Sequence, residues 1–253
     1  MLFRIGRVLL FYGAIIGVWQ AIAIAEVWPS YLFPSPVAVF EALWSSIKSG
    51  TIVQALGISM QRLAVGYAIS FVIGMSIGLV IGTVRWADET FGTIVLGLQS
   101  LPSITWLPLA VLWIGLNEQA IIFVVLMGSL FSIAISARSG VQGVPVLMRR
   151  AAQTFGASRW QMYRYVVIPA MLPAIVQGLK LGWSFAWRSL MAGELLFVSL
   201  GLGHLLNLGR DLNDISLVAA VMLVIIAVGL SVDRLIFGRI ESVLHERWGL
   251  ATS

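Results

Sequence analysis

The sequence predicts an all-α membrane protein with six transmembrane helices, and two observations support this prediction. The 253 residues are 59% hydrophobic and only 11% charged, with a mean hydropathy of +0.97. A soluble domain carries about 25% charged residues, so this chain lacks the charge that a water-facing surface needs. Its apolar residues also form runs of about 18 or more, which is long enough to cross a bilayer as helices. The composition therefore excludes a soluble enzyme, a disordered chain and a nucleic-acid-binding module.

Six apolar runs follow one another along the chain and are the expected spans: Val8–Ala25, Leu63–Val84, Phe91–Leu116, Ala120–Ala137, Val166–Leu190 and Leu217–Phe237. Proline removes a backbone hydrogen bond and clashes with the preceding helical turn. We therefore expect Pro102 and Pro108 to kink the third span. Pro169 and Pro173 should bend the start of the fifth.

The first span also has features of a cleaved signal peptide. Arg4 and Arg7 precede the apolar stretch, and small residues such as Ala23 and Ala25 follow it. The apolar run is long for the core of a signal peptide, so we expect a retained membrane anchor.

The basic residues predict the orientation of the spans. With the N-terminus inside, 11 of the 16 basic residues are cytoplasmic: Arg4, Arg7, Arg85, Arg138, Arg149, Arg150, Arg159, Arg164, Arg234, Arg239 and Arg247. The other five, Lys48, Arg62, Lys180, Arg188 and Arg210, lie outside or within the membrane. Basic residues accumulate on the cytoplasmic side. We therefore expect a multi-pass protein of the cell inner membrane with both termini in the cytoplasm.

A short amphipathic segment follows Pro34-Ser35-Pro36, between the first two spans. Apolar residues at helical spacing form one of its faces: Val37, Phe40, Leu43, Trp44 and Ile47. This pattern predicts a helix lying in the outer membrane interface, with packing against other spans as the alternative. Residues 1–62 and a five-helix core, 63–253, are expected to form a single transmembrane domain.

Glycines recur at four-residue spacing in two spans. Gly74, Gly78 and Gly82 lie in the second, and Gly178 and Gly182 lie in the fifth. Small residues let helix backbones approach closely. The spacing predicts tight helix packing, either within one subunit or between subunits.

The cytoplasmic segment 138–164 has 27 residues, five arginines and no acidic residue. Pro145 can begin a helix over 146–155, and Gly156 suits the left-handed conformation that ends one. Ser158, with a glutamine three residues later, has the pattern of a capping box. The sequence therefore predicts a helix–glycine–helix knuckle. Composition alone would also allow a basic loop held on anionic lipid headgroups.

The order of residues in this segment resembles the EAA signature of ABC importer permeases. That signature is Glu-Ala-Ala, three residues, Gly and, after a spacer, an apolar residue and Pro; the matching residues are Ala151, Ala152, Gly156, Ile168 and Pro169. Arg150 stands where the family usually has Glu. The resemblance implies that an ATPase subunit grips the knuckle, at Arg150, Ala151, Ala152, Phe155, Gly156, Ala157 and Ser158.

The resemblance covers most of the chain and is strongest to the subfamily that imports nitrate, sulfonates, taurine and bicarbonate. The similar segments include Leu32–Pro36, Leu101–Leu109, Trp113–Leu116, Ala192–Leu195 and Gly201–Gly203. It implies a type I importer transmembrane domain with a cytoplasmic coupling helix. The implied partners are two ATPase subunits, a second permease subunit that is expected to be identical, an external substrate-binding protein and membrane lipid, with no nucleic acid.

The chain itself carries no P-loop, because the G-x-x-x-x-G that cradles phosphates precedes neither Lys48 nor Lys180. We therefore expect no cofactor on this chain, and ATP and Mg²⁺ on the partner ATPase.

Polar residues inside two spans predict the walls of a translocation path. Charged side chains within a membrane are costly and usually face a cavity. Lys180, Ser184 and Arg188 follow one another at four-residue steps and form one candidate wall for an anion. The alternative is that Lys180 pairs with an acid such as Glu194 or reaches polar backbone on another helix. The second candidate wall, around Pro102, comprises Gln99, Ser100, Ser103 and Thr105; packing at a kink is its alternative.

We therefore expect the permease subunit of an ATP-driven importer for a small anion, working by alternating access. A self-sufficient channel, a secondary transporter and a membrane-embedded enzyme are the alternatives. No H-E-x-x-H motif occurs, and neither His204 nor His245 belongs to a recognisable constellation of nucleophile and acid in the sequence. No catalytic or metal site is expected on this chain.

Overall fold

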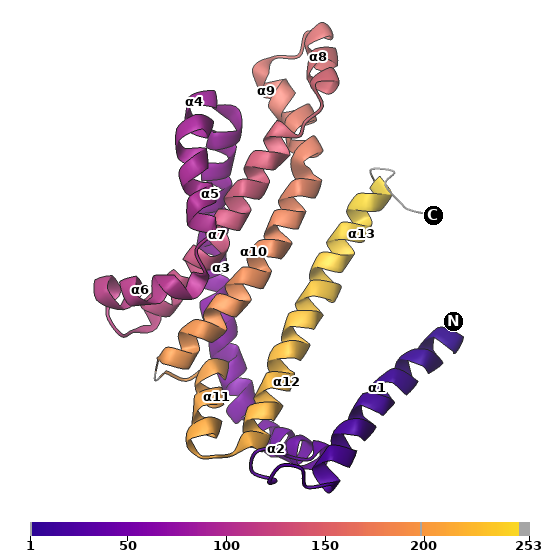
Figure 1. The fold of residues 1–253 in the computed structure, drawn as a ribbon. Helices are drawn as coiled ribbons and strands as arrows, with labels where there is room; N and C mark the ends of the chain where they lie inside the picture. Colours follow the sequence, from indigo (N-terminus) through magenta and orange to yellow (C-terminus); the bar gives the residue numbers. More distant parts are fainter. Residues whose placement is uncertain (1, 198, 248–253) are drawn as a thin grey trace. The chain divides into compact units, whose positions relative to one another are not determined.

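The computed structural model describes residues 2–197 and 199–247, with the side chains of residues 2–5, 8, 245 and 247 left out of the description. The described chain is built from helices (Figure 1). It divides into two compact units: unit 1 comprises residues 1–59 and 198–227, and unit 2 comprises residues 60–197 and 228–253.

Unit 1 contains α1 (Leu2–Ile24), α2 (Pro36–Lys48), the start of α3 (Thr51–Thr83), α11 (Leu202–Asp211) and most of α12 (Ile215–Ser231). The helix predicted between the first two spans is confirmed as α2. Ser35 caps it, because its hydroxyl accepts a hydrogen bond from the Ala38 N–H at 3.2 Å. The Trp19 indole donates to the Pro34 carbonyl at 3.0 Å and ties α1 to the segment before α2.

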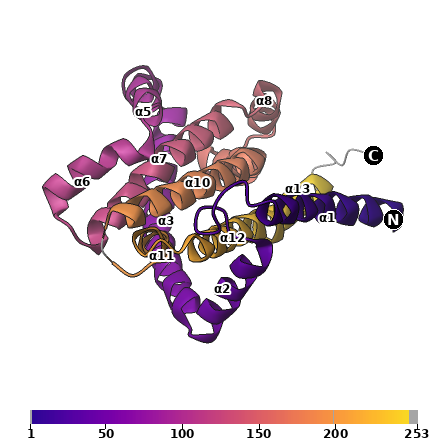
Figure 2. The same ribbon diagram turned by 60° about the horizontal axis from the view of Figure 1, so that its bottom comes forward.

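Unit 2 contains the rest of α3, α4 (Arg85–Ala87), η1 (Asp88–Gly92), α5 (Thr93–Gln99), η2 (Ser103–Trp106), α6 (Leu107–Ile114), α7 (Glu118–Gln142), α8 (Val146–Thr154), α9 (Arg159–Met162), η3 (Tyr163–Val167), α10 (Ile168–Leu196), η4 (Val232–Phe237) and α13 (Gly238–Arg247). Helices α7 and α10 run side by side, as Figure 2 shows. The functional features described below all belong to this unit.

Glycines hold α7 between α3 and α10. A Cβ placed on Gly78 of α3 would lie 2.2 Å from the Ala134 carbonyl oxygen of α7. A Cβ placed on Gly178 of α10 would lie 2.2 Å from the Cβ of Ser136, also on α7. Both predicted glycine patterns are therefore used for close packing within this chain.

Within the described residues, four helical segments are long and apolar enough to cross a membrane: Thr51–Thr83, Glu118–Gln142, Arg159–Leu196 and Ile215–Leu244. A fifth is possible if the bent pair Arg85–Gln99 and Ser103–Ile114 is one span. The apolar part of α1 is shorter and covers Leu9–Ile24 among the described residues. The chain is thus an all-helical membrane protein with four to five candidate spans by length and composition.

The third predicted span is broken rather than kinked. Its two halves meet at 101°. Pro102 has the extended angles φ −56° and ψ 134°, so the helix stops before it. The prediction that Pro108 adds a kink is wrong, because Pro108 lies in the first turn of α6, where its missing N–H costs no hydrogen bond.

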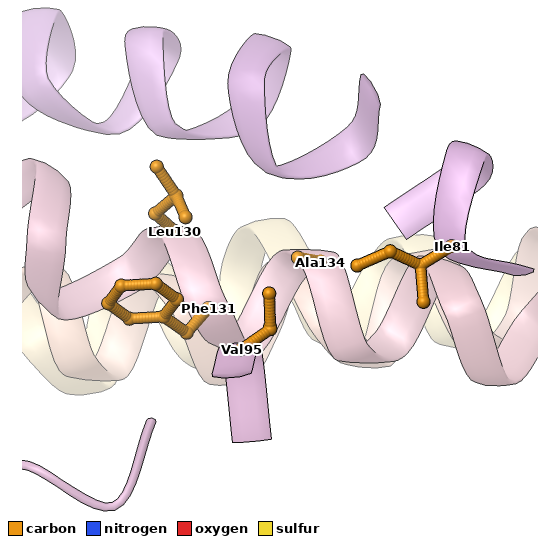
Figure 3. Close-up of a cluster of buried hydrophobic side chains, with 5 residues drawn as sticks. All are labelled: Ile81, Val95, Leu130, Phe131 and Ala134. Atoms are coloured by element: carbon orange, nitrogen blue, oxygen red, sulfur yellow. The ribbon is translucent and has the colours of Figure 1, made fainter. Parts of the chain in front are cut away.

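A buried cluster anchors the first half of this broken segment (Figure 3). Ile81 of α3 and Val95 of α5 pack with Leu130, Phe131 and Ala134 of α7. Val95 therefore holds α5 against the glycine-packed pair α3 and α7.

The fifth predicted span begins with an irregular turn. The π-helical turn η3 leads into α10, with Pro169 in the first turn of α10 and Pro173 inside the helix. The sequence placed a bend at this point, and the structure places a π-turn there.

Candidate functional site

The knuckle predicted from sequence is present, and local signals define its first helix. Helix α8 starts directly after Pro145 and ends at Thr154. Gly156 adopts φ +76°, the left-handed conformation that favours glycine. The Ala157 N–H donates to the Ala152 carbonyl at 3.0 Å and the Gly156 N–H donates to the Gln153 carbonyl at 2.9 Å. These two bonds form a Schellman cap, so α8 has a defined end.

The second helix of the knuckle, α9, carries the predicted capping box. The Gln161 N–H donates to the Ser158 hydroxyl at 3.3 Å, and the Ser158 N–H donates to the Gln161 side-chain oxygen at 2.8 Å. The turn between α8 and α9 is therefore fixed by backbone and cap hydrogen bonds.

Large apolar side chains project from this ordered segment. Leu147 is 78% exposed and Phe155 is 90% exposed. Trp160, on α9, is 73% exposed. Ordered apolar groups exposed together mark an interaction surface. Leu147, Ala151 and Phe155 recur at four-residue spacing and so share one side of α8 and its C-cap, which we call the outer face of α8.

The base of the knuckle is fixed to the neighbouring helices. Val141 and Val144 pack against Val167 of η3 and Met171 of α10. Helix α9 (Arg159–Met162), η3 (Tyr163–Val167) and α10 (Ile168–Leu196) follow one another without an intervening loop, so the knuckle is joined directly to α10.

Three of the four residues of the second predicted wall line a cavity of about 210 Å³, and Thr105 is absent from its described lining. Gln99, Ser100 and Ser103 contribute to it from the break in the third segment, together with Ser132 of α7 and Phe185 of α10. The Gln99 amide donates to the Ser132 hydroxyl at 3.4 Å. The break thus brings hydroxyl and amide groups to one hollow.

The first predicted wall, on α10, does not join this cavity. Lys180, Ser184 and Arg188 are absent from its described lining. The Lys180 ammonium lies 3.5 Å from an Asp233 oxygen and 3.1 Å from a Glu241 oxygen. Ser184 donates to the Lys180 carbonyl at 3.2 Å.

Arg188 lies beside the cavity without lining it. Its guanidinium lies 5.4 Å from the centre of the Phe185 ring, which does line the cavity. Arg188 is therefore an exposed cation next to one wall.

The suggestion that Glu194 is the acidic partner of Lys180 is wrong. Glu194, fully buried, pairs with Arg62 at 2.9 Å, and Arg62 is only 3% exposed. A second Arg62 nitrogen lies 2.6 Å from the exposed carboxylate of Glu118. This cluster joins α3, α7 and α10. Sequence analysis named Arg62 and Glu194 separately but offered no signal that pairs residues 132 positions apart.

Comparison with known proteins identifies the chain. Residues 70–237 match the family model of the binding-protein-dependent transport system inner membrane component. The chain belongs to this family. It is a permease component of an ABC transporter, and the ATPase activity lies in a separate subunit.

Three relatives resemble this permease over most of its length. A putative ABC transporter permease of Methanocaldococcus jannaschii is 33% identical over 86% of this chain and 83% of its own. A putative aliphatic sulfonates transport permease of Escherichia coli K12 is 28% identical over 82% and 80%. The nitrate import permease of Synechocystis sp. PCC 6803 is 29% identical over 87% and 82%.

A solved structure agrees with the fold of this permease. The MetNI methionine ABC transporter in an inward-facing conformation matches with a TM-score of 0.65 at 20% identity, over 78% of this chain and 97% of the other. Family membership removes the reason to treat the permease as a membrane enzyme or a self-sufficient channel.

Proposed function

We propose that this permease forms half of the translocation path of an ATP-driven importer for a small anion. In this proposal six spans cross the inner membrane, with both termini and the knuckle in the cytoplasm. A second, identical copy completes the path. Two ATPase subunits dock on the cytoplasmic side, and an external binding protein delivers the anion.

The observation that carries the proposal is the ordered, capped knuckle with its exposed apolar outer face. In the proposed complex, Arg150, Ala151, Ala152, Phe155, Gly156, Ala157 and Ser158 form the contact with the ATPase. Closure of the two ATPases on ATP swings α8, and the direct connection through η3 moves α10. Rigid-body rocking of this kind would alternate access to the path.

The proposed path runs past Gln99 and Ser103. Their cavity offers hydroxyl and amide donors, and Arg188 places a positive charge beside it. Both features suit an anion, as do the sulfonate and nitrate names of two relatives. Ser184 continues the wall along α10.

Lys180 takes the structural role in this proposal. Two carboxylates already neutralise its ammonium. Sequence analysis left two roles open for Lys180, a pore position and a pair with an acid. The contacts of Lys180 with Asp233 and Glu241 favour the pair.

Co-purification tests the coupling role. The tagged chain is extracted from its native membrane in mild detergent, and a P-loop ATPase is expected with it in stoichiometric amount. Ala152→Asp places a charge in the proposed contact and should release the ATPase. Arg239→Gln, an exposed charge change on α13, is the matched control and should retain it.

Recovery of the intact chain without an ATPase in several mild detergents would overturn the proposal. Loss of the ATPase from both variants alike would also count against a contact at the knuckle.

Transport by the assembled complex in liposomes tests the path. Labelled sulfonate and nitrate are offered with the binding protein. Gln99→Ala and Arg188→Gln should each lower uptake while ATPase co-purification stays unchanged. Normal uptake in both variants would show that the anion passes elsewhere.

A further inference from the structure

A second cavity, of about 200 Å³, lies behind the knuckle on the inner side of α8. Arg149 and Gln153 of α8 line it together with Tyr163 of η3 and Thr83 at the end of α3. All these residues belong to unit 2. The cavity is separate from the one beside Gln99, because the two share no lining residue.

One side chain that lines the cavity has a buried polar atom without a hydrogen-bond partner among the described residues. One Arg149 nitrogen donates to the Val141 carbonyl, which fixes the guanidinium in place. Its Nε is buried and has no hydrogen-bond partner among the described residues. A buried donor without a partner is destabilising. The guanidinium is therefore fixed in place while its Nε–H has no acceptor among the described residues.

Neighbouring side chains add donors and no negative charge. Gln153 can supply an amide N–H and Tyr163 can supply a hydroxyl. Thr83 gives its own proton to the Leu79 carbonyl at 2.7 Å. The lining contains no carboxylate, and neither does the whole segment 138–164.

The cavity also faces away from the outer face of α8. At 100° per residue, Arg149 and Gln153 lie on the side of α8 opposite Leu147, Ala151 and Phe155. An ATPase docked on the outer face would leave this inner cavity to another ligand.

We propose that this cavity binds a phosphate-type oxyanion through Arg149, Gln153 and Tyr163. An arginine fork that offers donors to oxygen in an acid-free hollow suits phosphate chemistry. The oxyanion is either free inorganic phosphate or the headgroup phosphate of an anionic lipid. Because the cavity joins α8, α3 and η3, a bound oxyanion would brace the knuckle against the body of unit 2.

The test uses the full chain in detergent and in nanodiscs. Inorganic phosphate is titrated at constant ionic strength while the melting temperature and heat of binding are measured. In parallel, the chain is placed in nanodiscs of phosphatidylcholine with or without phosphatidylglycerol, and bound lipid is counted by native mass spectrometry. Stabilisation by phosphate alone identifies the free ion, and retention of phosphatidylglycerol identifies the headgroup; either supports the site.

Variants locate the binding. Arg149→Gln should weaken it by about tenfold or more, because a charge-assisted hydrogen bond is lost. Arg159→Gln removes the same charge from an exposed position of the same segment and should leave affinity within about twofold. Tyr163→Phe removes only a hydroxyl and should weaken binding severalfold, even if Arg149→Gln folds poorly.

Three results would overturn the proposal. The first is no binding of phosphate and no retention of phosphatidylglycerol. The second is equal weakening by Arg149→Gln and Arg159→Gln, which indicates an unspecific charge effect. The third is that the ATPase no longer co-purifies with the Arg149→Gln variant while the wild type binds no oxyanion. This result would indicate that Arg149 pairs with a carboxylate of a partner subunit instead. The first two leave ATPase co-purification unaffected, so they do not touch the proposed coupling role.

Discussion

The knuckle and the α3–α7–α10 seam, defined by its glycine contacts and the Arg62–Glu194 pair, use opposite arrangements of polar and apolar groups. The seam buries a charge pair, with Arg62 3% and Glu194 0% exposed. The knuckle exposes Phe155 to 90%. The seam satisfies its charges within the chain, whereas the outer face of α8 leaves its apolar groups to a partner. The difference separates the part that holds the fold from the part that meets other subunits.

The comparison predicts that changes in the seam lower stability, while changes on the outer face of α8 lower partner binding. Unfolding in mixed detergent micelles, followed by the fluorescence of the ten tryptophans, measures the first property. Co-purification of the ATPase measures the second.

The largest loss of stability is expected from Glu194→Ala. It removes the fully buried partner of the Arg62 guanidinium, and breaking a buried pair costs about 3–5 kcal/mol. Glu118→Gln is the control and should cost less, because the Glu118 carboxylate is 66% exposed and solvent screens its attraction to Arg62. Equal losses in the two variants would contradict the central place of the buried pair.

Gly78→Ala is expected to cost about 1–3 kcal/mol, because its methyl group would overlap the Ala134 carbonyl oxygen and push α3 from α7. Gly97→Ala is the matched control: its Cβ would meet no atom within 4 Å. An unchanged unfolding midpoint for Gly78→Ala would show that α3 and α7 can separate freely.

Gly156→Ala is expected to cost about 1–2 kcal/mol, since the left-handed backbone at φ +76° is strained for alanine. Space is not the cause, because a Cβ there would meet no atom within 4 Å. Gly156→Asn should cost less, because asparagine tolerates this conformation. If both variants lose stability alike, backbone strain is not the reason for glycine.

The smallest loss of stability, within about 0.5 kcal/mol, is expected from Phe155→Ser, because the side chain is 90% exposed. The same variant should lose the ATPase on purification. A stable, fully ATPase-bound Phe155→Ser chain would break the comparison, because the outer face would then need no partner.

Sequence analysis predicted the features that depend on neighbouring residues. Pro145, Gly156 and the Ser158 capping box act over a few positions, so the knuckle followed from their order. The partners of Lys180 did not follow from the order of residues. Glu241 lies 61 residues away, and the sequence alone does not distinguish it from any other acid near the membrane.

The position of the break at Pro102 was predicted from the sequence, but the angle between its two halves was not. Pro102 cannot donate a backbone hydrogen bond, which places the break, but the angle of 101° also depends on how the second half packs, with Trp106 stacked on Phe131. The cavity behind Arg149 was missed because it needs α3, α8 and η3 together.

The buried Arg62 cluster has a consequence for the order in which the protein is made. Glu118 is synthesised 56 residues after Arg62, and Glu194 132 residues after it. At roughly 5–20 residues per second, the first partner arrives after about 3–11 s and the second after about 7–26 s. For that interval α3 carries a charge whose final partner does not yet exist, so the exposed Glu118 is the earlier counter-ion and the arrival of α10 completes the burial.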